Sequence, residues 1–108
     1  MDPIEEQLLA YNTRDLDRFL AVYSSDVVIE DGENHVVVIG LAQLRERYGA
    51  LFDASPNLHC RIVNRIKIGS YTVDDEEVTD WNDLPMPVHA AVVYRVQGDK
   101  IVHVRLLR

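Results

Sequence analysis

The feature that most constrains the fold of this chain is a regular alternation of side chains over residues 58–68. Leu58, Cys60, Ile62, Asn64, Ile66 and Ile68 alternate with His59, Arg61, Val63, Arg65 and Lys67. This period of two is typical of one long strand, with Leu58, Ile62 and Ile66 on the buried face and the basic residues on the exposed face. Further strands are predicted over residues 71–81, 87–96 and 100–107, because turn-forming residues separate these segments. We therefore expect the second half of the chain to form an antiparallel sheet.

The first half of the chain is predicted to be mainly helical. Pro3 suits the first turn of a helix, in which its missing N–H is not needed. Apolar residues of three helices recur at spacings of three and four: Ile4, Leu8 and Tyr11; then Leu16, Phe19, Leu20 and Tyr23; then, after Gly40, Leu41, Leu44, Tyr48, Leu51 and Phe52. The β-branched runs at 27–30 and 36–39 predict a short hairpin before the third helix.

These elements predict one α+β domain spanning residues 1–108. The chain has 108 residues, of which 47% are hydrophobic and 27% charged, which is the usual range for one folded domain with a single core. A single curved sheet wrapped around three helices is the economical way to bury all the apolar faces.

Composition disfavours several classes of function. The net charge of −7 disfavours nucleic acid as a partner, because phosphate binding needs a positive surface. We expect no membrane partner and a cytoplasmic location, since no apolar stretch could span a bilayer and the acidic N-terminus does not fit a signal peptide. No cofactor or metal is expected, because glycine-rich phosphate loops and zinc-type Cys/His spacings are absent. The single Cys60 is either a buried apolar residue or a reactive thiol, and the alternation favours burial.

Asp31 is the first candidate for chemistry. It ends residues 26–31 (Asp-Val-Val-Ile-Glu-Asp), just before Gly32, where a short strand is expected to stop. A carboxylate at the mouth of an apolar domain could remove a proton as a general base. Asp-Gly is also the sequence of a tight hairpin turn, so a purely structural turn residue is the competing interpretation. His35 lies across the same hairpin and could pair with Asp31 or relay a proton.

Several stretches resemble the nuclear transport factor 2-like superfamily, which includes ketosteroid isomerase, scytalone dehydratase and SnoaL-like polyketide cyclases. They are residues 12–19 continuing into 26–28, Gly40-Leu41, and residues 94–96 with 98–102. Residues 73–79, Val-Asp-Asp-Glu-Glu-Val-Thr, resemble a signature of bacterial SnoaL-like proteins related to steroid isomerases. The resemblance covers nearly the whole chain. It implies a cone-shaped barrel, in which three N-terminal helices pack inside a strongly curved, mainly antiparallel sheet.

The resemblance also implies a catalytic role for Asp31, because residues 29–31 match the segment that carries the proton-transfer base of ketosteroid isomerase. The two oxyanion-stabilising positions of that enzyme fall on Gln7 and near Val92, where a tyrosine and an aspartic acid would be required. Because such donors usually make the largest catalytic contribution, authentic steroid isomerisation is not expected. Gln7 could replace the tyrosine as a hydrogen-bond donor.

The cone implied by the resemblance would enclose a mainly apolar cavity. The residues expected to line it are Gln7, Tyr11, Tyr23, Tyr48, Phe52, Ile62, Trp81, Ala90, Val92, Tyr94 and Val104. Core packing is the competing interpretation for each aromatic residue. Either Glu76 or Glu77 must face the cavity if the strand alternates, and Glu76 is slightly favoured over Glu77. A solvated edge of the sheet is the competing interpretation for both. A carboxylate facing the cavity would have a raised pKa and could act as acid or base.

The outer face of the sheet is predicted to carry positive charge. The basic residues are His59, Arg61, Arg65, Lys67, His89, Arg95, His103 and Arg105, and the apolar residues among them are Val63, Ala91, Val93 and Leu107. The resemblance implies that this face forms a homodimer, and a site for anions or an acidic partner is the rival interpretation. A monomer mass in solution at micromolar concentration would disprove the dimer.

Two functions are therefore expected. The first is an enzyme, an isomerase, cyclase or dehydratase that acts on a small apolar carbonyl compound, with Asp31 as base and Glu76, His35 or Gln7 assisting. The second is a non-catalytic module that binds a small lipophilic ligand or dimerises.

Overall fold

The computed structural model describes residues 2–108. Its elements follow one another as α1 (Pro3–Thr13), α2 (Leu16–Leu20), β1 (Tyr23–Asp31), β2 (Val36–Ile39), α3 (Gly40–Ala54), β3 (His59–Ile68), β4 (Tyr71–Thr79), the short 3-10 helix η1 (Trp81–Asp83), β5 (Val88–Gln97) and β6 (Lys100–Leu107). The predicted α+β class is confirmed, and so is the predicted order of helices and strands. None of the helices in this part of the chain is long and apolar enough to cross a membrane.

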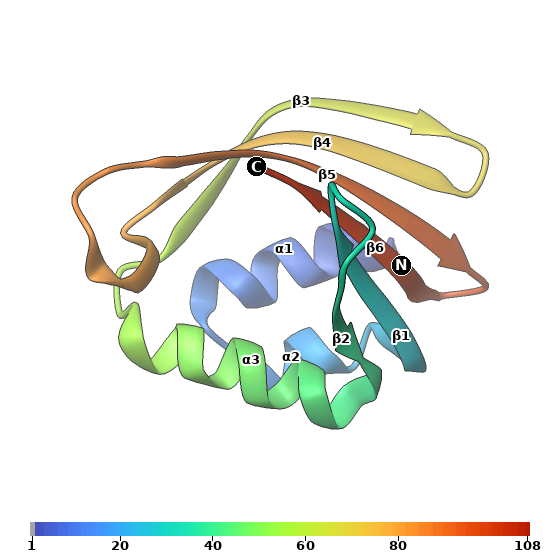
Figure 1. The fold of residues 1–108 in the computed structure, drawn as a ribbon, viewed down its shortest axis with the longest axis horizontal. Coiled ribbons are helices and arrows are strands. Elements are labelled where there is room, and N and C mark those ends of the chain that lie inside the picture. Colours follow the sequence, from blue (N-terminus) through green and yellow to red (C-terminus); the bar gives the residue numbers. More distant parts are fainter. Residues whose placement is uncertain (1) are drawn as a thin grey trace.

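The strands form one mixed sheet in the order β2-β1-β6-β5-β4-β3. Neighbouring strands are antiparallel except β1 and β6, which are parallel. In Figure 1, β3, β4 and β5 arch over α1 and α3, while β1 and β2 descend at the other end of the sheet. The sheet and the helices therefore form two layers, and the concave face of the sheet is turned toward the helices.

The second helix is shorter than the apolar periodicity suggests. It begins at Asp15, whose carboxylate accepts a hydrogen bond from the Arg18 amide at 3.2 Å, and it ends at Leu20. The prediction that Tyr23 lies on this helix is wrong, because Tyr23 opens β1 and pairs with Ile101 of β6. Sheet pairing at this position outweighs the local helical pattern.

An aromatic cluster joins the three helices to the sheet. Phe19 of α2 lies at its centre and is almost fully buried. Its ring centroid is 4.7 Å from that of Tyr48 on α3 and 4.9 Å from that of Tyr23 on β1. Tyr11 of α1 packs edge-on against Phe52 of α3 at 5.7 Å. Tilted and edge-on contacts of this kind favour a fixed arrangement of rings, so the cluster gives the helices a defined position under the sheet.

A bulge in β3 reverses which of its side chains face the helices. The pairing of β3 with β4 shifts between Ile62 and Asn64. Because side chains alternate along a strand, one extra residue moves every following side chain to the opposite face. Beyond the bulge Arg65 turns toward α1, whereas Ile66 and Ile68 are 48% and 67% exposed. The predictions that Ile66 faces inward and Arg65 outward are therefore wrong.

A buried ion pair fixes β3 and β4 to α1. The Nε and Nη2 atoms of Arg65 donate to the two carboxylate oxygens of Asp74 at 2.6 and 2.9 Å, and the same guanidinium contacts Glu5 of α1. The Asp74 side chain is completely buried. Lys67, also predicted on the outer face, pairs with Asp2 at the start of α1. A carboxylate so deeply buried is tolerated because it is paired and fully hydrogen-bonded.

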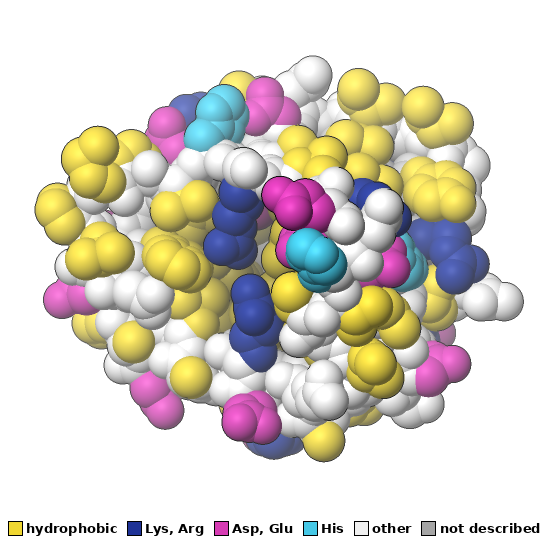
Figure 2. All heavy atoms as spheres, viewed as in Figure 1, with side chains coloured by type: hydrophobic (Ala, Val, Ile, Leu, Met, Phe, Trp, Pro, Cys, Tyr) yellow, Lys and Arg dark blue, Asp and Glu magenta, His cyan; other side chains and the backbone are white. Residues whose placement is uncertain are grey.

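The outer face of the sheet is less positive than predicted. His89 pairs with Asp75 at 2.6 Å, and His103 and Arg105 pair with Glu30 at 2.9 and 3.0 Å. The bulge also turns Arg65 and Lys67 away from this face, on which they were predicted to lie. The exposed side chains of Ile66 and Ile68 take their place. Figure 2 shows hydrophobic side chains gathered at the upper right, over the ends of β3 and β4 seen in Figure 1. The homodimer through this face stays a prediction.

Candidate functional site

A cavity of about 490 Å³ opens between the concave face of the sheet, α1, α3 and η1. Its walls are mainly aromatic and aliphatic. Of the residues predicted to line it, the structure places all except Phe52 and Ile62 in the lining. Phe52 is buried in the aromatic cluster, and Ile62 lies next to the bulge of β3 and is half-buried. A cavity of this size and character suits a small organic molecule.

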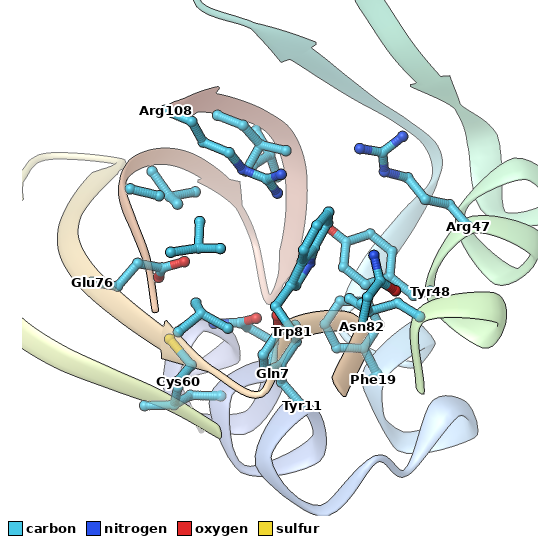
Figure 3. A pocket seen from close by; sticks show the side chains of 18 of the residues that line it. Gln7, Tyr11, Phe19, Arg47, Tyr48, Cys60, Glu76, Trp81, Asn82 and Arg108 are labelled. Carbon is cyan, nitrogen blue, oxygen red and sulfur yellow. The ribbon is translucent and has the colours of Figure 1, made fainter. Parts of the chain in front are cut away.

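Glu76 is the acidic residue of the cavity wall. It lies on β4 between Ile62 of β3 and Ala90 of β5, and Figure 3 shows its carboxyl group pointing into the cavity. Burial raises the pKa of Glu76 to about 7, although the Cys60 thiol beside it favours the ionised form. Glu77 points the opposite way and pairs with Arg61 at 3.4 Å. Near neutral pH, Glu76 can therefore both accept and return a proton.

Besides two arginines described below, the other polar groups of the wall are neutral hydrogen-bonding groups. Burial raises the pKa of Tyr11, Tyr23 and Tyr94, so their hydroxyl groups stay protonated at physiological pH. Gln7 of α1 is 4% exposed and lines the same cavity (Figure 3). Together these groups offer several uncharged donors to an oxygen atom of a bound molecule.

Cys60 lies on the cavity wall beside Glu76. It is buried, and burial raises the pKa of its thiol, so the thiolate needed for nucleophilic chemistry is disfavoured. This agrees with the interpretation of Cys60 as a buried apolar residue. No group of three or more His, Cys, Asp or Glu side chains within residues 2–108 lies close enough together to hold a metal ion.

Asp31 and His35 lie outside the cavity lining, in the turn between β1 and β2. The Asp31 carboxylate accepts hydrogen bonds from the amides of Glu33 at 2.8 Å and His35 at 2.9 Å, and its other oxygen is 3.3 Å from His35 Nδ1. The hydrogen bond from the His35 amide, followed by that from Glu33, lowers the pKa of Asp31. This is the geometry of a turn residue, and it corrects the expectation that Asp31 stands at the mouth of the apolar cavity.

Replacing Asp31 with alanine should loosen this turn and leave the cavity intact. The amides of Glu33 and His35 lose the carboxylate that accepts from them, so their hydrogen exchange should accelerate. Amide exchange followed by NMR measures the effect. Unchanged protection at both amides would contradict the turn role, and the resonances of Trp81, which lines the cavity, serve as the control.

Two basic residues of the lining, Arg47 and Arg108, were not among the predicted site residues. Arg47 follows Leu44 by three residues and precedes Leu51 by four, so helical spacing puts it on the inward face of α3. Arg108 continues the inward alternation of Val104 and Leu106 beyond the end of β6. Both positions could have been found by extending the periodic patterns to charged residues.

Comparisons with known proteins agree on family and fold. A model of the SnoaL-like domain matches residues 4–104. An uncharacterised cystatin-fold protein from Novosphingobium aromaticivorans is 28% identical, with a TM-score of 0.89 over 100% of this chain and 99% of that chain. A candidate polyketide cyclase from Sinorhizobium meliloti is 15% identical, with a TM-score of 0.81 over 96% and 92% of the two chains.

A third similar structure is an LEH-like epoxide hydrolase from M. tuberculosis. It is 16% identical, with a TM-score of 0.83 over 97% of this chain and 78% of that chain. No curated protein matches the chain in sequence. The fold is the nuclear transport factor 2-like, or ketosteroid isomerase-like, fold.

Proposed function

The chain belongs to the SnoaL-like domain family, and from this we propose that its cavity binds a small, mainly apolar carbonyl compound and transfers a proton on it. The observation that carries the proposal is Glu76, a carboxyl group with a pKa of about 7 on the wall of an apolar cavity. A general acid–base group is most effective when its pKa is close to the working pH. Glu76 takes the role that the sequence comparison assigned to Asp31.

The proposed reaction needs only groups of the cavity wall. The Glu76 carboxylate removes a proton from the carbon next to the carbonyl group, and the electron pair moves onto the carbonyl oxygen. A neutral donor, the Gln7 amide or a tyrosine hydroxyl such as that of Tyr11, stabilises the resulting enolate oxygen. Protonated Glu76 then returns a proton to the same carbon, which gives exchange once the carboxyl proton has been traded with solvent. In a carbonyl compound with a β,γ double bond, it returns the proton to the γ-carbon instead and the double bond moves into conjugation, which is an isomerisation. Neither outcome gains or loses a proton overall.

Hydrogen–deuterium exchange into ketones tests this proposal. The protein is incubated in D2O with cyclohexanone, 2-decalone and 4-phenyl-2-butanone, and NMR follows deuterium at the α-carbons. For a ketone that the cavity accepts, exchange should rise with pH through about 7 and then level off, because the ionised form of Glu76 is the base. Glu76→Gln should lower the rate about 100-fold, whereas Asp31→Asn should leave it unchanged. Equal rates in wild type and Glu76→Gln would sink the proposal.

A non-catalytic binding module is the second candidate. It is favoured by the apolar wall and by the absence of the oxyanion pair of ketosteroid isomerase at Gln7 and Val92. In that case ketones would bind and change the fluorescence of Trp81. The rate of deuterium exchange at their α-carbons would equal the rate measured without protein.

A further inference from the structure

Two arginine side chains stand at the cavity in addition to the groups used above. Arg47 extends from α3 and Arg108 follows the last residue of β6, and both are exposed. Figure 3 shows their guanidinium groups on the same side of the cavity, pointing toward each other from these two elements. In Figure 2, basic side chains likewise flank the hollow at the centre of this face. The mouth therefore has positive charge on both sides.

Among residues 2–108, neither guanidinium group has a side-chain carboxylate within 4.0 Å. The ion pairs in this part of the chain involve other basic residues, such as Arg18, Arg45 and Arg61. Arg108 instead lies over the ring of Trp81, 5.4 Å from its centroid. Glu76 is the one acidic residue in the described lining. The cavity entrance of this chain, whose net charge is −7, therefore carries two guanidinium groups without a side-chain carboxylate partner.

We propose that Arg47 and Arg108 form a binding site for the carboxylate of an otherwise apolar ligand, whose body fills the cavity behind them. A guanidinium group matches the planar, two-oxygen geometry of a carboxylate and stays charged at any physiological pH. The aromatic walls accept the apolar body. This inference rests on the proposed function and narrows its substrate to a carbonyl compound that also bears a carboxylate.

The anion site also fixes the direction in which the ligand enters. A carboxylate next to ionised Glu76 would be repelled, and one at the mouth is attracted by two positive charges. The ligand therefore places its charged end at Arg47 and Arg108 and its uncharged end toward Glu76. Positive charge at the opening of a low-dielectric cavity also raises the local concentration of anionic ligands.

The affinities of a matched pair of probes test the anion site. 4-Phenylbutanoate and 4-phenylbutanamide have the same size and shape and differ in charge. Trp81, the single tryptophan, lies in the cavity wall and reports their binding by fluorescence. Wild type should bind the carboxylate about tenfold more tightly than the amide at low salt. Arg47→Gln and Arg108→Gln should each weaken carboxylate binding about fivefold and leave amide binding unchanged.

Arg95→Gln is the matched control, because Arg95 is an exposed arginine of β5 outside the cavity lining. It changes the net charge by the same amount and should alter neither affinity by more than about twofold. Equal affinity for carboxylate and amide in wild type and in both cavity variants would overturn the anion site while leaving the cavity function standing. If neither probe binds, the anion site fails, and the ketone exchange assay decides on the proposed function separately.

Discussion

Replacing Asp74 with alanine should lower the free energy of unfolding by about 3–5 kcal/mol. The Asp74 side chain is completely buried and makes both hydrogen bonds of a two-point contact with Arg65. Its removal leaves a guanidinium group of which only 16% is exposed facing an apolar interior. Glu5 remains as a partner at the surface and cannot replace the buried carboxylate. Urea denaturation at neutral pH measures the loss.

The neighbouring Asp75 provides the control for this experiment. Its carboxylate lies on the outer face, 46% exposed, and pairs with His89. An exposed pair of this kind is worth at most about 1 kcal/mol, so Asp75→Ala should have a small effect. The double variant Arg65→Met, Asp74→Leu removes both charges together and should recover much of the stability. Equal losses for Asp74→Ala and Asp75→Ala would show that burial of the ion pair has no energetic importance.

Replacing Glu76 with glutamine should remove a pH-dependent loss of stability of about 3 kcal/mol. The pKa of Glu76 is about 7 in the folded chain, against an ordinary value of 4.5. Below pH 4.5 the carboxyl group is protonated in both the folded and the unfolded chain, so folding buries no charge at this position. Between pH 4.5 and 7 the unfolded chain loses this proton while the folded chain keeps it. The contribution of neutral Glu76 to stability is therefore lost as the pH rises through about 7.

Denaturation at a series of pH values from 4 to 8 measures this effect. At each pH the free energy of unfolding of wild type is subtracted from that of the variant, which cancels the contribution of histidine titration. Glu77→Gln is the control. Glu77 is the next residue of β4, its side chain is 40% exposed, and it pairs with Arg61 on the outer face. We expect the stability of Glu76→Gln relative to wild type to increase with pH and that of Glu77→Gln to stay nearly flat. A flat difference for Glu76→Gln would mean that its pKa is ordinary and would also remove the basis for its proposed catalytic role.

The order of elements could be predicted from the sequence because each follows from local periodicity. The alternation from Leu58 to Ile62 and the helical spacing from Gly40 hold in the structure. The place of Tyr23 could not be predicted, because its pairing with Ile101 joins segments far apart in the chain. The bulge after Ile62 was equally hidden, since the residues around it alternate without a break. A bulge depends on the fit between two strands, and this fit is a property of the pair.

Part of the site could also be predicted from the periodicity of single strands. Alternation along β4 indicated that either Glu76 or Glu77 faces the cavity, and the structure places Glu76 there. The resemblance gave Asp31 the role of the base by position, yet its carboxylate accepts hydrogen bonds from amides within its own turn. The Asp-Gly sequence favours a tight turn through interactions with its own neighbouring residues. The turn role of Asp31 was therefore available from the sequence as the competing interpretation. Arg47 and Arg108 were missed because only apolar residues were followed along the inward faces.

The parallel pairing of β1 with β6 has a consequence for how the chain folds during its synthesis on the ribosome. Residues 23–31 leave the ribosome before the other strands, whereas residues 100–107, which lie between β1 and β5 in the sheet, leave after all of them. Until they emerge, the β1–β2 hairpin and the strands β3 to β5 are two separate pieces with unpaired edges. Such edges attract other strands, so the nascent chain needs protection until β6 arrives to join them. The sheet is therefore completed at its centre by the strand that is synthesised last, and folding of the domain is expected only after β6 has emerged.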